Sequence, residues 1–150
     1  MSLRDDFTAS LKEAMKAGDK LKTSTLRLIT SALKDRDIEA RGSGKTLSED
    51  DILALLQKMV KQRQESLKIY TEAGRTDLAE QEQGEIAIIQ SFLPQQMDAD
   101  AVSSAIDSVI AETGAASIKD MGKVMAVLKE RFAGRMDFGA ASGAIKSKLG

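Results

Sequence analysis

A helical hairpin that ends at the only proline constrains this fold more than any other feature of the sequence. Between Lys61 and Met97, apolar residues recur at spacings of three and four among charged residues, which is the periodicity of an amphipathic helix. These apolar residues are Leu67, Tyr70, Leu78, Ile86, Ile89 and Phe92. The pattern breaks at Gly74 and ends at Pro94, because the residue before a proline is pushed out of helical geometry. The segment therefore predicts two helices joined by a tight turn, followed by a domain boundary.

Capping residues and glycines divide the whole chain into seven expected helices. The first four are expected at about residues 4–17 and 20–41, from the capping-box-like start at 48–51 to Gly74, and from there to Leu93. The other three are expected from Asp98 or Asp100 to Gly114, from Ser117 to Gly134, and from Asp137 onward. No window shows the β-branched alternation of a strand. The sequence thus predicts an all-α protein, with an N-terminal helical hairpin region at 1–93 and a compact C-terminal three-helix bundle at 98–150.

The composition excludes several kinds of chemistry. The chain contains no histidine and no cysteine, so thiol catalysis, Cys/His zinc sites and imidazole-based triads are absent. The segment Gly44-Lys45-Thr46 lacks the phosphate-loop glycine five residues earlier, where Glu39 stands instead. Aromatic residues make up only 3% of the chain, which argues against stacking platforms for single-stranded nucleic acid. We therefore expect no catalytic residues, no metal site, no cofactor and no nucleotide binding.

The sequence also predicts where the protein resides. The aliphatic run Ile86–Ile89 is far too short to span a bilayer. Arg4, Asp5 and Asp6 stand where a secretory signal peptide needs apolar residues. The lack of cysteine suits a cytoplasmic protein. We therefore expect a cytoplasmic protein that has no membrane contact.

Charged residues of the hairpin form a candidate polar network. Its members are Lys61, Arg63, Arg75, Asp77, Glu82 and Glu85. Glu82 and Glu85 lie three residues apart and share a helix face, where they can pair with Arg63 and Lys61 or hold a metal ion. Helical carboxylate metal sites usually include histidine, so the ion-pair interpretation is favoured. Arg75 at the tip is expected either to be solvated, as charges at a tip usually are, or to bind the carbonyl groups left open at the end of the preceding helix.

The end of the chain is basic although the protein is nearly neutral. From Lys119 onward there are seven basic and three acidic residues, a net charge of +4. A phosphate backbone rewards such a surface through counterion release, whereas the alternative is a set of solubilising lysines. The candidate RNA contacts are Lys119, Lys123, Arg131, Arg135, Lys146 and Lys148. Gly122, Gly139 and Gly143 lie within expected helices, where close helix packing is the favoured explanation and an exposed backbone that meets a ligand is the alternative.

Three linked segments carry a family resemblance that covers nearly the whole chain. They are residues 11–35, 61–97 and 119–137, with the motifs Lys61-Gln62-Arg63, Ala73-Gly74-Arg75 and Gly122-Lys123-Val124-Met125. Together they resemble the YqeY family, which shares its helical domains with the C-terminal tail of the B subunit of glutamine-dependent tRNA amidotransferases. The resemblance implies an all-helical fold and a tail that holds tRNA without performing chemistry. It also explains why such proteins attract the label of a carbon–nitrogen ligase with glutamine as amido donor.

One turn departs from the family pattern. The tail domain typically carries Gly-Lys-Ala-Asn-Pro before its last helix, whereas this chain has Gly134-Arg135-Met136-Asp137-Phe138. A basic residue is kept at Arg135, but an acid replaces the asparagine.

Two hypotheses about function follow from the sequence. The leading one is a non-catalytic helper that binds tRNA or another structured RNA through the basic C-terminal bundle. The alternative is a protein–protein interaction module that docks through the long helical hairpin, and a free-standing enzyme ranks third. The position of Lys123, Arg135 and Lys146 helps to separate the first two. If these side chains lie on one face, RNA binding is favoured; if they scatter and an apolar patch is exposed on the third and fourth helices, the protein partner is favoured.

Overall fold

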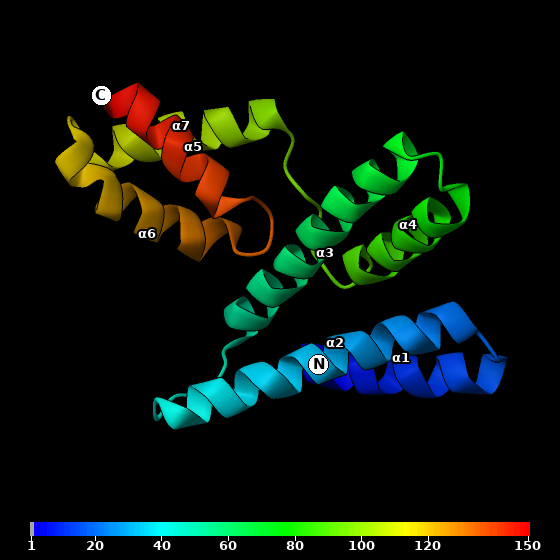
Figure 1. The fold of residues 1–150 in the computed structure, drawn as a ribbon. Helices are drawn as coiled ribbons and strands as arrows, with labels where there is room; N and C mark the ends of the chain where they lie inside the picture. Colours follow the sequence, from blue (N-terminus) through cyan, green and yellow to red (C-terminus); the bar gives the residue numbers. More distant parts are fainter. Residues whose placement is uncertain (1) are drawn as a thin grey trace. The chain divides into compact units, whose positions relative to one another are not determined.

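The computed structural model describes residues 2–150, which form seven α-helices and one short 3-10 helix, with no strand among these residues (Figure 1). The elements are α1 (Leu3–Ala17), α2 (Lys20–Gly42), α3 (Glu49–Glu72), α4 (Thr76–Gln90), α5 (Ala99–Thr113), η1 (Ile118–Asp120), α6 (Met121–Phe132) and α7 (Phe138–Leu149). The all-α prediction is confirmed. The described chain divides into two compact units, a first that ends at Leu93 and a second, Pro94–Gly150.

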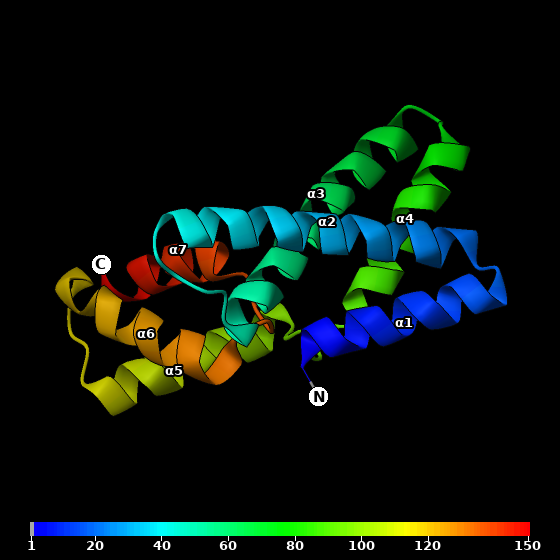
Figure 2. The same ribbon diagram turned by 90° about the horizontal axis from the view of Figure 1, so that it is seen from below.

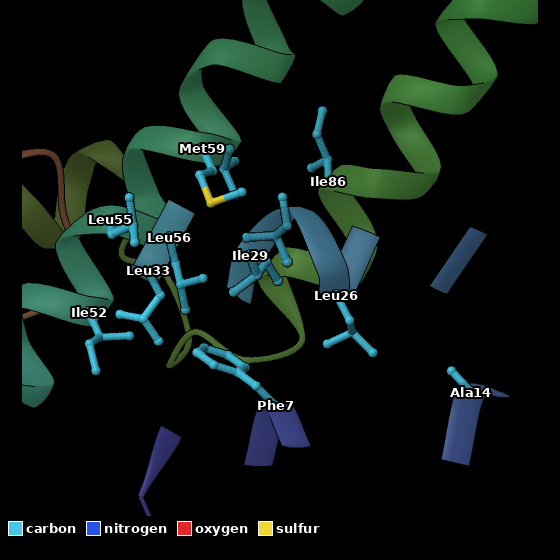
Figure 3. Packing of buried hydrophobic residues seen from close by; sticks show 12 residues of the cluster. Phe7, Ala14, Leu26, Ile29, Leu33, Ile52, Leu55, Leu56, Met59 and Ile86 are labelled. Carbon is cyan, nitrogen blue, oxygen red and sulfur yellow. The ribbon is translucent and has the colours of Figure 1, made fainter. Parts of the chain in front are cut away.

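The first unit consists of two helical hairpins that cross. α1 packs beside α2, α3 packs beside α4, and α2 also contacts α3 and α4 (Figures 1 and 2). Fully buried side chains from all four helices meet between the hairpins, among them Phe7, Leu26, Leu56 and Ile89. Figure 3 shows the side chains of α1, α2, α3 and α4 converging in this core. Burial of such apolar side chains contributes about 1.5–3 kcal/mol each, which is why the two hairpins hold together.

The local sequence explains where these helices begin and end. Asp19 accepts a hydrogen bond from the amide of Lys22 and caps α2, and Ser48 and Asp51 cap α3 reciprocally. Gly74 has a φ of +71°, the left-handed conformation that reverses the chain between α3 and α4. α2 approaches α4 closely at Gly84, where an added Cβ would lie 2.6 Å from Leu21 Cδ2.

The second unit is a three-helix bundle. Its core gathers apolar side chains of α5, α6 and α7, including Ile106, Val124, Leu128 and Ile145. The segment at 94–97 is hydrogen-bonded to the turn between α6 and α7. The amide of Met97 donates to the Arg135 carbonyl at 2.9 Å, and Gln96 Nε2 donates to the Gly134 carbonyl at 2.6 Å. This segment is therefore fastened within the second unit.

The end of the fourth helix differs from the sequence expectation. α4 ends at Gln90 and not at Leu93. The amides of Phe92 and Leu93 bond to carbonyls three residues back, at 3.1 and 3.0 Å, which tightens the last turn ahead of Pro94. Leu93 matched the apolar periodicity of the helix because it packs against the core of the first unit, but it does so from beyond the end of α4.

Candidate functional site

A buried ion pair joins the two helices of the long hairpin. Arg63 Nε on α3 donates to Glu85 Oε2 on α4 at 3.0 Å, and Arg63 Nη1 donates to the Met59 carbonyl at 3.1 Å. Glu85 is only 6% exposed. A charge in such a place is tolerated when it is both paired and hydrogen-bonded, as it is here. The pair joins α4 to α3. This structural role is enough to explain why both charged residues are buried, without a bound substrate.

Glu82 lies one turn from Glu85 and is half-buried. Removal from water raises the pKa of Glu82, and the neighbouring Glu85 carboxylate raises it further, while Arg63 acts in the opposite direction. Lys61 is exposed on α3. Of the six residues in the candidate network, the structure thus brings Arg63, Glu82 and Glu85 together.

Two other members of that network, Arg75 and Asp77, lie at the hairpin tip. Arg75 Nε is 3.5 Å from Asp77 Oδ1, and both side chains are exposed. The carbonyl of Tyr70 at the end of α3 accepts a hydrogen bond from the backbone amide of Arg75 at 2.9 Å. The main chain therefore satisfies this carbonyl, and the Arg75 side chain is exposed beside Asp77, which agrees with the solvated alternative.

Three of the six candidate RNA contacts are engaged within the second unit. Arg131 Nη2 lies 2.7 Å from Glu112 Oε2, and Lys148 Nζ lies 2.6 Å from Asp107 Oδ1. The Arg131–Glu112 hydrogen bond lowers the pKa of Glu112 and raises that of Arg131. Arg135 donates from Nε to the Gln95 carbonyl at 3.1 Å, and its guanidinium lies 5.9 Å from the centre of the Phe132 ring. These side chains tie elements of the bundle to one another.

The other three basic candidates lie at one end of the bundle. Lys119 is in η1, Lys123 is in the first turn of α6, and Lys146 is in the last turn of α7. The end of α7 lies beside η1, since a Cβ added at Gly150 would be 3.6 Å from Ile118 Cδ1 (Figures 1 and 2). All three lysines are exposed, and none forms an ion pair within the described residues 2–150. We call these three residues the lysine end.

Arg135 lies apart from the lysine end. It follows the last residue of α6, whereas Lys123 is in the first turn, and a helix of this length spans about 18 Å. Lys123 and Arg135 therefore lie toward opposite ends of α6, and three of the six candidate cations remain at the lysine end.

The helical glycines near the lysine end are not explained by close packing. A Cβ added at Gly122 or at Gly143 would meet no atom within 4 Å, and both positions are exposed. The packing interpretation is therefore wrong for these two residues, because no neighbouring helix of the described chain approaches them. They leave helix backbone open to the surroundings.

Neither a metal-binding cluster nor a membrane-spanning helix is found among residues 2–150. Within residues 2–150, no group of three or more His, Cys, Asp or Glu side chains is arranged to hold a metal ion. No helix of the same residues is long and apolar enough to cross a membrane.

Sequence patterns missed the acidic partners on α5. Asp107 and Glu112 carry no motif, and each meets a basic residue of another helix only after the bundle packs. The one feature of the sequence that could have pointed to these acids is that both lie on the polar side of the expected fifth helix, where they are available to pair with a basic residue.

Together these features define a two-unit, all-helical protein whose polar clusters join helices or face solvent. A comparison with family models adds the particular group. The model described as "Yqey-like protein" matches residues 4–149, so the chain belongs to the YqeY family. The resemblance expected from the three sequence segments is confirmed.

Curated relatives come from yeasts and share one name, "Altered inheritance of mitochondria protein 41, mitochondrial". The protein of Lachancea thermotolerans is 39% identical over 85 residues, which are 57% of this chain and 44% of that protein. The protein of Vanderwaltozyma polyspora is 30% identical over 118 residues, 74% of this chain and 62% of that protein. The protein of Saccharomyces cerevisiae is 34% identical over 85 residues, 57% of this chain and 45% of that protein. This chain spans about half the length of these relatives.

The names of these relatives correct the expected location. The relatives are named as mitochondrial proteins, which points away from a cytoplasmic location. The expectation failed because the lack of cysteine does not distinguish one disulfide-free compartment from another.

Proposed function

We propose that this protein is a non-catalytic helper that binds structured RNA, with tRNA as the first candidate, through the lysine end of its second unit. One observation carries the proposal. Lys119, Lys123 and Lys146 come from three elements, lie at one end of the bundle and have no salt-bridge partner within 4 Å among the described residues. One acid lies beside them, Asp120, and Lys123 contributes to lowering the pKa of its carboxyl. Cations that are not already neutralised gain most from a phosphate backbone, because each contact releases counterions.

The surroundings of the lysine end support a phosphate ligand. Gly122 is adjacent to Lys123, and Gly143 lies one turn before Lys146, so no side chain at these two positions obstructs a ligand that approaches the two lysines. Aromatic residues are scarce, which favours recognition of a folded shape over stacking on single-stranded bases. The resemblance of the family to the tail of the amidotransferase B subunit supports tRNA in particular. The same resemblance accounts for a ligase label without assigning that activity to this chain.

The experiment compares two triple variants of the full chain. The first removes the lysine end with Lys119→Ala, Lys123→Ala and Lys146→Ala, and the matched control removes Lys12, Lys16 and Lys20, which are exposed on the first unit. Affinity for folded tRNA is measured by fluorescence anisotropy at low salt. We expect the first variant to lose at least about tenfold in affinity while the control stays close to the unmodified protein. The proposal would be wrong if both variants lost the same amount of tRNA affinity, or if the unmodified chain did not bind tRNA.

A second candidate function is docking of a protein through the α3–α4 hairpin. The observation that favours it is Ile69 on α3, a large apolar side chain that is 63% exposed. One exposed isoleucine is a smaller signal than three exposed cations at one end of the bundle, since single apolar side chains are common on protein surfaces. An Ile69→Glu variant that loses a protein partner while keeping tRNA affinity would favour the hairpin.

A further inference from the structure

One acid organises the connection between α5 and α6. The carboxylate of Asp120 accepts hydrogen bonds at Oδ2 from the backbone amides of Ala116 and Ser117, at 2.9 and 3.3 Å. The amide of Asp120 in turn donates to the Ser117 carbonyl at 2.9 Å. These three hydrogen bonds fold residues 116–120 on themselves, and Lys119 lies within the folded segment. We call residues 116–120 the Asp120 loop.

The Asp120 loop is held against the bundle on two sides. Ala115, immediately before it, packs against the core of the second unit. Ile118 is the one large apolar side chain of the loop, and a Cβ added at Gly150 would lie 3.6 Å from its Cδ1. The amide of Gly150 donates to the Lys146 carbonyl at 2.8 Å, so Ile118 meets the turn that carries Lys146. The fold of the loop therefore sets where Lys119 lies relative to Lys146.

Asp120 also lies among the cations of the lysine end. The hydrogen bonds from the two amides are the main cause that lowers the pKa of its carboxyl, and the charge of Lys123 adds to them. A carboxylate in this place weakens the attraction between the surface and a phosphate, because like charges repel. The charge of Asp120 thus opposes an RNA ligand, while its hydrogen bonds order the loop that carries Lys119. These two effects have opposite signs, so an experiment can separate them.

We propose that Asp120 is a positioning residue for RNA binding by the lysine end, an inference that rests on the proposed function. Asp120 does not contact the RNA. Its hydrogen bonds to the amides at 116 and 117 hold Lys119 where it contacts phosphate together with Lys123 and Lys146. A loop that is already ordered binds more tightly than one that its ligand has to order, because binding then costs less conformational entropy.

Two substitutions in the full chain separate the charge of Asp120 from its hydrogen bonds. Asp120→Asn removes the charge but keeps an oxygen that accepts from the amides, whereas Asp120→Ala removes both. Affinity for folded tRNA is measured by fluorescence anisotropy at low salt. We expect the alanine variant to bind about fivefold more weakly than the unmodified protein, a factor that corresponds to the typical loss of a capping side chain. The asparagine variant should bind at least as tightly as the unmodified protein.

Glu130→Ala is the matched control for charge. Glu130 is exposed in the last turn of α6, so this variant loses one acid of the same unit and leaves the Asp120 loop intact. It should bind tRNA no more weakly than the unmodified protein. Circular dichroism establishes that each variant keeps its helix content.

Two further measurements distinguish positioning from a general loss of structure. Hydrogen exchange at the amides of Ala116 and Ser117 should accelerate in the alanine variant, and the asparagine variant should restore the protection. This readout needs no RNA. The slope of log affinity against log salt should become shallower by roughly 0.7–0.9 in the alanine variant, because the phosphate contact of Lys119 is lost.

The inference is overturned if Asp120→Ala binds tRNA as tightly as Asp120→Asn, because Asp120 then acts only through its charge. It is also overturned if the alanine variant keeps the exchange protection at 116 and 117, or the salt slope of the unmodified protein. These results leave the proposed function intact, since the three lysines are unchanged in both variants. A lack of tRNA binding by the unmodified chain overturns both proposals, so the two failures are distinguishable.

Discussion

At the scale of single residues, the Arg63–Glu85 pair illustrates how this fold uses charge. The guanidinium meets one carboxylate and one backbone carbonyl, so its removal from water is compensated on two sides. Such a pair contributes little net stability compared with well-packed apolar residues, but breaking it is costly because the remaining charge stays buried. The sequence predicted a pair of this kind because Arg63 and Glu85 fall on facing positions of the expected hairpin.

Removal of one partner should therefore cost more than removal of both. We expect Glu85→Ala to lower the free energy of unfolding by about 3–5 kcal/mol, since Arg63 loses its counter-charge. The double variant Arg63→Met, Glu85→Leu should lose less than the sum of the two single losses. Urea denaturation of the three variants gives the comparison. Strict additivity would show that the pair is not coupled.

Glu82 makes the stability of the first unit depend on pH. Its pKa is raised above the ordinary value by burial and by Glu85, so the folded state binds the proton more tightly than the unfolded state does. The contribution of Glu82 to the free energy of unfolding is therefore fully present below the ordinary pKa of a glutamate, and it is lost as the pH rises through the raised pKa. A Glu82→Gln variant should gain stability relative to the unmodified protein between about pH 4 and 7. Denaturation curves across that range test the sign, and an advantage that shrinks with rising pH would contradict it.

At the scale of the elements, the sequence predicted helix boundaries well because capping is local. Ser48 with Asp51, Asp98 and Asp137 cap α3, α5 and α7 as expected. The end of α4 was placed three residues too far, because apolar periodicity does not reveal the tighter turn before Pro94.

The candidate sites were harder to predict, because they depend on pairings between helices. Arg131 and Lys148 appear as free cations in the sequence and become partners of Glu112 and Asp107 only when α5 packs against α6 and α7. Arg135 likewise finds the Gln95 carbonyl through the fold of the 94–97 segment. Composition sets how many cations exist, and packing decides which of them remain available to a ligand.

Helix α7 carries a stability cost at Gly143. The residue lies inside the helix with open space around its Cα, so an alanine fits without a clash. We expect Gly143→Ala to raise the free energy of unfolding by about 0.5–1 kcal/mol, because alanine loses less backbone entropy in a helix. Gly134→Ala is the control in which destabilisation is expected, because Gly134 is buried and has a φ of +76°, a left-handed conformation that alanine disfavours. Thermal denaturation should show the first variant stabilised and the second destabilised, and a destabilised Gly143→Ala would reveal a contact that an added Cβ disturbs.

At the scale of the whole molecule, we propose that each compact unit is an independently folding domain. Each has its own apolar core, around Leu56 in the first unit and around Leu128 in the second. Domains with separate cores open separately, because few contacts are shared between them.

Hydrogen exchange on the full chain tests this independence. Leu128→Ala should cost about 2–5 kcal/mol and lower the protection of amides in the second unit alone. Leu56→Ala is the matched variant and should lower protection only in the first unit. Loss of protection in both units from either substitution would mean that the two cores form one cooperative structure.

The salt dependence of tRNA binding tests most directly whether the lysine end binds phosphates. Affinity of the full chain for folded tRNA is measured at several salt concentrations, for the unmodified protein and for the Lys119, Lys123, Lys146 triple alanine variant. If each lysine contacts one phosphate, the slope of log affinity against log salt should become shallower by roughly 2–3 in the variant, since each lost contact removes about 0.7–0.9. The same slope in both proteins, or no tRNA affinity at low salt, would contradict RNA binding by this surface.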